Sequence, residues 1–163
     1  MHCVLLGVTK QMLGYWMLSS NRGNPFYIGD KVQQLDSRLL KIIIPDFFSR
    51  KPRSLAEHKS WKANELRSWL LYYSLPILQG VLADLYYVYF LLLSASIHLL
   101  TRESIGEEDY TAASQYLEDF CNKAEFLYGS AICTINLHLY GICQRLQSDG
   151  DLRGASLALG LKV

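Results

Sequence analysis

The strongest constraint on the fold is the stretch from residue 68 to residue 100, in which Asp84 is the only charged side chain. Each uncharged run beside Asp84 has 16 residues, whereas a membrane-spanning helix needs about 20 apolar residues. Pro76 and Gly80 interrupt the first run, and the second contains three tyrosines, two serines and a histidine. The stretch therefore favours buried helices in a bundle over a membrane hairpin, with a small membrane protein as the disfavoured alternative.

Apolar residues recur with helical spacing along most of the chain, and no long strand-like alternation is present. We therefore predict an all-α fold, a bundle of six or seven helices. The 50% of hydrophobic residues in 163 suffices for one core. Residues 1–147 are expected to form a single helical domain, and residues 148–163 a flexible C-terminal tail.

Local signals indicate where several helices begin and which face each one buries. Asp30 is predicted to be an N-cap. Ser54 and Glu57 are predicted to form a capping box that starts one helix. This helix is expected to carry on one side Trp61, Glu65, Trp69 and Tyr73. Residues 3–18 are expected to be helical, as are residues 131–147. The clearest stripe has a 3-4-3-4-3 spacing and ends before Gly129: Tyr110, Ala113, Leu117, Phe120, Ala124 and Leu127.

Metal, cofactor and catalytic motifs are missing from the sequence. It has no Gly-rich phosphate loop, no nucleophile elbow, no H-E-x-x-H and no C-x-x-C. Cys133, His138 and Cys143 are five residues apart, which does not keep them on one helix face, so we predict no metal site. His98 is interpreted as a hydrogen-bonded core residue. The four cysteines are expected to be thiols of an intracellular protein without a signal peptide.

Charge is segregated along the chain, although the net charge is only +1. Between residues 38 and 67, eight basic residues face three acidic ones, whereas between residues 103 and 125 seven acidic residues face Lys123 alone. Phe47, Phe48, Trp61 and Trp69 lie among the cations, a composition typical of surfaces that hold a phosphate backbone and stack on bases. The alternative is that the two segments pair with each other or are merely solvated.

Three blocks of the sequence resemble transposases of the CACTA/EnSpm type over roughly residues 1–139. The first is M-H-C-V-L-L-G-V-T-K at residues 1–10, and the third is F-L-Y-G at 126–129 with C-T-I-N-L-H-L at 133–139. The second is the most specific: it runs from L-D-S-R-L-L at 35–40 through R-K-P-R-S-L at 50–55 to W-K-A-N-E-L-R at 61–67.

The resemblance implies the helical insertion of an RNase-H-like transposase, whose carboxylates hold two divalent metals. The family's Asp, three residues before the histidine, is missing here, and the region that contains the family's final Glu is not found after residue 139. His2 is therefore the one residue that matches the family's catalytic neighbourhood. We therefore expect a truncated, catalytically inactive fragment without cofactors.

The leading expectation is weak, non-specific DNA binding, in the nucleus if the protein is DNA-associated. The residues predicted to contact nucleic acid are Arg50, Lys51, Arg53, Lys59 and Lys62. The alternative is a helical protein–protein interaction module that docks another chain, such as another transposase-like chain, through its acidic helix and exposed aromatic residues.

Overall fold

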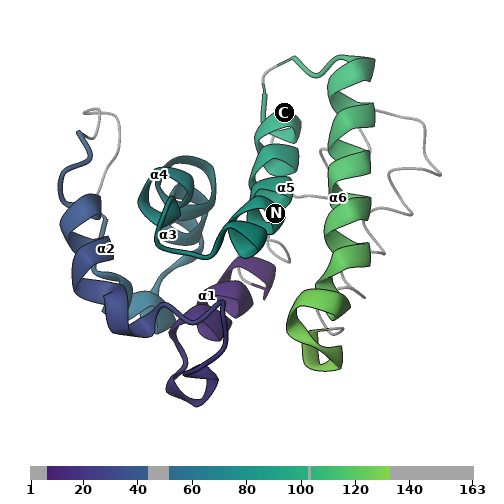
Figure 1. The fold of residues 1–163 in the computed structure, drawn as a ribbon. Coiled ribbons are helices and arrows are strands. Elements are labelled where there is room, and N and C mark those ends of the chain that lie inside the picture. Colours follow the sequence, from purple (N-terminus) through teal and green to yellow (C-terminus); the bar gives the residue numbers. More distant parts are fainter. Residues whose placement is uncertain (1–6, 44–51, 103, 133–163) are drawn as a thin grey trace.

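The computed structural model describes residues 7–43, 52–102 and 104–132, and these form an all-α fold with no strand among them. Figure 1 shows the six α-helices of this part of the chain. Their bounds are α1 Lys10–Met17, α2 Val32–Leu39, α3 Ala63–Ser68, α4 Ser74–Leu78, α5 Asp84–Leu100 and α6 Glu107–Tyr128. A 3₁₀-helix, η4 (Leu55–Ser60), precedes α3, and a π-helix, η5 (Trp69–Tyr73), joins α3 to α4.

The two longest helices, α5 and α6, lie side by side and make the main packing contact of the fold (Figure 1). The predicted α6 stripe is confirmed, because its members from Ala113 to Leu127 are buried and Tyr110 packs at the edge of the core. Carboxylates of Glu107, Glu108 and Asp109 occupy the first turn, where they complement the helix dipole. The helix ends at Gly129, whose φ of 80° is accessible to glycine at little cost.

Helix α5 lies between α6 and the unit formed by η5 and α4 (Figure 1). Its predicted central position is confirmed, since Tyr89, Phe90 and Leu93 are at most 2% exposed. The interpretation of His98 as a core residue is wrong, because this side chain is exposed. The helix is apolar on nearly every side, so hydropathy did not indicate which side faces solvent.

The single helix expected after Ser54 is broken into η4, α3, η5 and α4. Pro76 in α4 has no N–H to bond the carbonyl one turn earlier, and the wider π-turn of η5 lies directly before α4. The Leu70 carbonyl inside this turn accepts from the hydroxyls of Ser74 at 3.2 Å and Ser94 at 2.8 Å. Trp69 and Tyr73 are nevertheless buried, so the predicted face is confirmed although the helix is not continuous.

An aromatic cluster fastens α1 to α5 and α6. Trp16 is fully buried, packs edge-on against Phe90 at 4.9 Å and donates from Nε1 to the Tyr128 hydroxyl at 2.9 Å. Tyr89 stacks on Phe120 with ring centroids 4.3 Å apart. These contacts join residues from both ends of the described chain, so the core is one unit.

Two predicted helix caps are wrong in detail. Asp30 does not cap α2, which begins at Val32; its carboxylate accepts from Arg22 at 2.6 Å instead. Ser54 does cap η4, but through the Ala56 N–H at 3.1 Å and without a reciprocal bond from Glu57. The carboxylate that closes an N-terminus in this region is Glu65, which accepts from the Lys62 N–H at 2.8 Å.

Several predictions lie outside the described residues: the helix at 131–147, the tail at 148–163, His2, and the thiols of Cys3, Cys133 and Cys143. Cys121 is described, and its side chain is buried. Within the described ranges, none of the helices combines the length and the hydropathy that a bilayer crossing requires.

Candidate nucleic-acid interface

Three of the five cations predicted to contact nucleic acid lie in the described structure, on η4 and the turns beside it. Arg53 precedes η4, Lys59 lies within it, and Lys62 is the residue before α3. Arg50 and Lys51 fall outside the described residues, as do Phe47 and Phe48. The local sequence therefore brings three predicted cations together around one short helix and its connection to α3.

Arg53 is occupied by contacts within the protein. Its Nε and Nη2 donate to the two carboxylate oxygens of Glu65 at 2.6 and 2.9 Å, and Nη1 donates to Glu57 at 3.0 Å. Nη1 and Nη2 also donate to the hydroxyl and carbonyl oxygens of Ser60. These are five hydrogen bonds, and a guanidinium has five N–H groups, so this geometry leaves none for a phosphate. The hydrogen bond to Glu65 is also the main cause that raises the pKa of Arg53.

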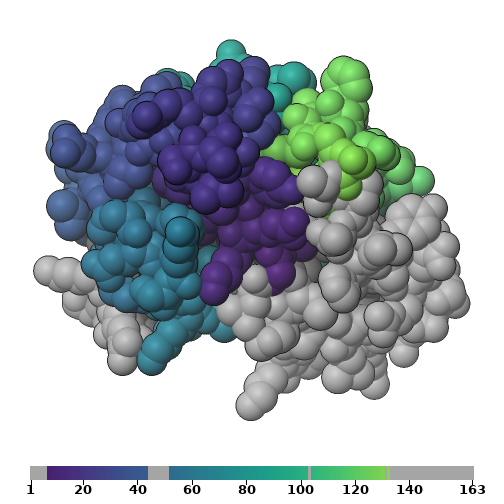
Figure 2. Space-filling view, turned by 90° about the horizontal axis from the view of Figure 1, so that it is seen from below, coloured from purple at the N-terminus to yellow at the C-terminus, as the bar shows by residue number. Residues whose placement is uncertain are grey.

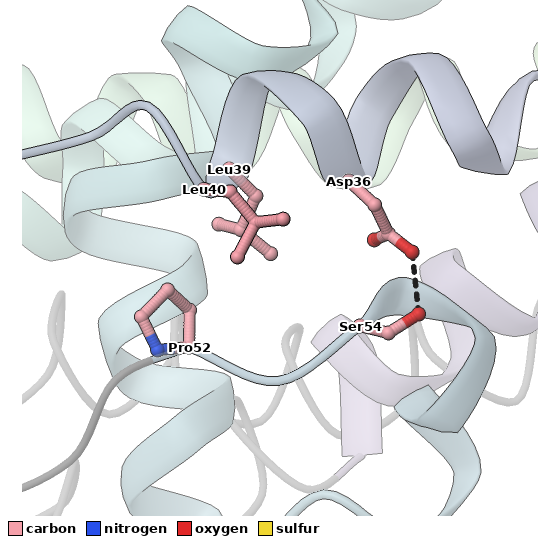
Figure 3. Close-up of a pocket in the computed structure, with 5 residues that line it drawn as sticks. All are labelled: Asp36, Leu39, Leu40, Pro52 and Ser54. Carbon is pink, nitrogen blue, oxygen red and sulfur yellow. Dashed lines mark hydrogen bonds between the residues drawn. The ribbon is translucent and has the colours of Figure 1, made fainter.

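The start of η4 is fixed against α2 by a second carboxylate. Asp36 accepts from the Ser54 hydroxyl at 2.5 Å (Figure 3). It also accepts from the Leu55 N–H at 2.8 Å. A cavity of about 90 Å³ lies beside this contact, with Leu39, Leu40 and Pro52 on its other sides (Figure 3). Ligand pockets typically measure 300–1,000 Å³, so this cavity suits a few water molecules and not a substrate. The hydrogen bonds of Asp36 with Ser54 and Leu55 therefore hold η4 in place against α2.

Lys59 and Lys62 project from this anchored element and are exposed. Neither ammonium lies within 4 Å of a carboxylate of the described residues. The fold adds Lys10, which is also exposed and lies on α1, the helix that packs against η4. Figure 2 shows the two segments adjoining on one face of the molecule, α1 in purple and the η4 segment in blue-teal. The sequence did not indicate Lys10, because only the tertiary contact of α1 with η4 brings it toward His58.

His58 is buried close to these cations, and the charges of Lys59 and Lys10 affect its pKa. Its ring is 6% exposed, and Nδ1 lies 2.8 Å from the Leu55 carbonyl oxygen, so Nδ1 carries the proton that is donated. Burial is the largest cause that lowers the pKa of His58; the Leu55 bond opposes it, and the charges of Lys59 and Lys10 lower it further. Both lysines therefore act on one buried imidazole, which remains neutral at pH 7.

The two tryptophans described in this region do not form a stacking surface. Trp61 is 6% exposed and Trp69 is 1% exposed, and their rings contact each other with centroids 5.7 Å apart. Base stacking requires an accessible ring face, so the expectation that these tryptophans stack on bases is not met in this structure. The candidate interface therefore attracts a partner mainly through its positive charge.

The basic and acidic segments do not neutralise each other within the described ranges. The ion pairs found there are local: Arg22 with Asp30, Arg53 with Glu57 and Glu65, Arg102 with Asp109, and Lys123 with Asp119. None joins residues 52–67 to residues 104–132. Arg38 of α2 is also occupied within the fold, since it donates to the carbonyls of Ile77 and Gln79 at the end of α4. The Lys59 and Lys62 charges therefore face solvent.

No cluster of three or more potential metal ligands forms among the described residues. The histidine and cysteines considered as ligands, at positions 133, 138 and 143, lie outside them. Comparison with protein-family models, with curated proteins and with solved structures found no match for this chain.

Proposed function

We propose that this chain is a non-catalytic, transposase-derived helical domain that binds nucleic acid weakly through the phosphate backbone. The observation that carries the proposal is the pair of exposed ammonium groups of Lys59 and Lys62 on an anchored 3₁₀-helix and turn, without carboxylate partners among the described residues. Lys10 supplements them from α1. The resemblance to CACTA/EnSpm transposases in residues 50–67 supports the choice of nucleic acid as the partner.

The number and type of these groups set the character of the binding. Lysine ammonium groups act as point charges and attract phosphates without reading bases, whereas base recognition needs bidentate or stacking groups. Arg53 is committed to Glu65, and Trp61 and Trp69 are buried. We therefore expect binding that is independent of sequence and steeply weakened by salt.

Retention of a labelled duplex in a low-salt gel-shift assay tests the proposal. The double variant Lys59→Gln/Lys62→Gln should retain the duplex less than the wild type does. The matched control is Arg102→Gln/Lys123→Gln, which removes the same charge from exposed residues in and beside α6. Equal retention by the two double variants would show that net charge, and not this surface, governs any binding.

A variant with Arg50→Gln and Lys51→Gln extends the test to the other two predicted cations. We expect it to lower retention further when it is combined with the Lys59/Lys62 variant, because each phosphate contact contributes separately. An Arg53→Gln variant that retains its fold should bind as well as the wild type does.

The proposal includes the absence of catalysis. In the resembled transposases strand cleavage needs carboxylates that hold two divalent cations, and no cluster of three or more potential metal ligands forms among the described residues. Magnesium-dependent nicking of DNA by the purified chain, abolished by His2→Ala, would contradict this part of the proposal.

A helical interaction module is a second candidate function, favoured by the apolar side chains that stay exposed on the two longest helices. Phe126 on α6 is 87% exposed, and Leu85 and Val88 on α5 are 59% and 56% exposed. Exposed apolar surface of this kind marks contact sites for other macromolecules.

A further inference from the structure

His58 is a buried titratable side chain on η4, the short helix that also carries Lys59. The imidazole is held in place, since Nδ1 donates to the Leu55 carbonyl oxygen at 2.8 Å and the residue is 6% exposed. The neutral ring carries its proton on Nδ1, so Nε2 is the atom that takes up a second proton. Among the described residues, Nε2 has no hydrogen-bond partner. A lone pair is therefore available for protonation.

The charges that act on His58 are positive. Lys59 follows it on η4, and Lys10 lies on α1, which packs against η4. The carboxylates of the same neighbourhood are engaged elsewhere, because Glu57 of η4 lies in an ion pair and Asp36 of α2 bonds the start of η4. Within the described part of the chain, the ring forms no ion pair with a carboxylate. Burial and two ammonium groups therefore oppose a positive charge on this imidazole.

We propose that nucleic acid binds to this surface together with a proton, which the imidazole of His58 takes up from solvent at Nε2. This inference rests on the function proposed above. A phosphate beside Lys59 and Lys10 offsets part of the positive charge that keeps the ring neutral, and a buried group responds strongly because little water screens it. Binding and protonation are therefore coupled, and each favours the other by the same factor.

The sign of this coupling sets the pH dependence of binding. In the free protein the pKa of His58 is lowered, first by burial and then by the two lysines, and a bound phosphate raises the pKa from that value. Proton uptake is largest between the pKa of the free protein and the pKa of the complex. At constant ionic strength, the association constant should be about three- to tenfold higher at pH 5.5 than at pH 7.5.

Calorimetric titration of the wild-type chain with a duplex, at low salt and pH 6, tests this proposal. Titrations in two buffers of different ionisation enthalpy should show an uptake of up to about one proton per bound chain. Proton NMR should show that His58 titrates at a higher pH when the duplex is bound, whereas the exposed His98 shifts less. Duplex binding without proton uptake would overturn this proposal and leave the proposed function standing. Absence of duplex binding at low salt would overturn both.

Two single variants assign the proton to its residue. His58→Gln should bind the duplex without the proton uptake seen in the wild type, and His98→Gln, the matched control, should retain the uptake. Helical circular dichroism checks that each variant is folded. Uptake that persists in a folded His58→Gln variant would overturn the proposal. If that variant does not fold, the wild-type NMR titration decides, and an unchanged His58 titration on adding duplex would overturn the proposal.

Discussion

Arg53 and Glu65 form a two-point ion pair, with Nε and Nη2 of the guanidinium 2.6 and 2.9 Å from the two carboxylate oxygens. The Glu65 carboxylate also accepts from the Lys62 N–H at the start of α3. One carboxylate thus joins the segment before η4 to the helix after it. This contact assigns Arg53 a structural role and leaves the neighbouring lysines as the charges available to a partner.

Replacing Arg53 with Gln should lower the thermal unfolding midpoint more than replacing Arg22 with Gln does. Arg22 forms a single ion pair with Asp30 in which both side chains are at least 60% exposed, and such pairs contribute little. Arg53 makes five hydrogen bonds, and its loss leaves the half-buried Glu65 carboxylate without its main partner. Equal midpoints for the two variants would contradict the assigned role of Arg53.

Replacing Tyr128 with Phe should destabilise the protein by about 1–3 kcal/mol, because the buried Trp16 N–H loses its acceptor. Chemical denaturation measures this free energy. The double variant Trp16→Phe/Tyr128→Phe should cost less than the sum of the two single variants, since each single change already breaks the same bond. Strict additivity would mean that this bond does not couple α1 to α6.

The buried His58 should make stability depend on pH. Its pKa is lowered in the folded protein, chiefly by burial, so the unfolded chain binds more protons below the ordinary histidine value of 6.5. The contribution of His58 to stability is therefore fully present above pH 6.5 and is lost as the pH falls. The free energy of unfolding then decreases by up to about 1.4 kcal/mol per pH unit. His58→Gln should flatten the dependence of unfolding free energy on pH between 7 and 5. His98→Gln is the control, because that side chain is exposed and the slope should persist.

The sequence pattern predicted the one-sided apolar stripe of α6 and the central position of the uncharged helix α5. The α6 stripe ends at Gly129 as expected, and α5 occupies the centre. The pattern failed where a tertiary contact decides the outcome. The helix expected after Ser54 is interrupted at Trp61 and Lys62, whose backbone is extended, and again at the π-turn, whose Leu70 carbonyl accepts from Ser94 of α5. Asp30 bonds Arg22 in place of a helix N-terminus.

The candidate interface was predictable as a region but not residue by residue. Composition indicated a basic segment, and Lys59 and Lys62 are exposed within it. Composition could not show that Arg53 is committed to Glu65, that Trp61 and Trp69 face the core, or that α1 brings Lys10 toward His58. Some of these facts depend on contacts between residues that are distant in sequence. The others depend on which side of a short helix faces the core.

The salt dependence of duplex binding tests the central claim most directly. The logarithm of the association constant should fall linearly with the logarithm of salt concentration, with a slope of about −0.9 for each phosphate neutralised. We predict that Lys59→Gln/Lys62→Gln reduces the magnitude of this slope by about 2, and that Arg102→Gln/Lys123→Gln leaves the slope unchanged. A slope that is the same in both double variants, or a wild type that does not bind the duplex even at low salt, would contradict it.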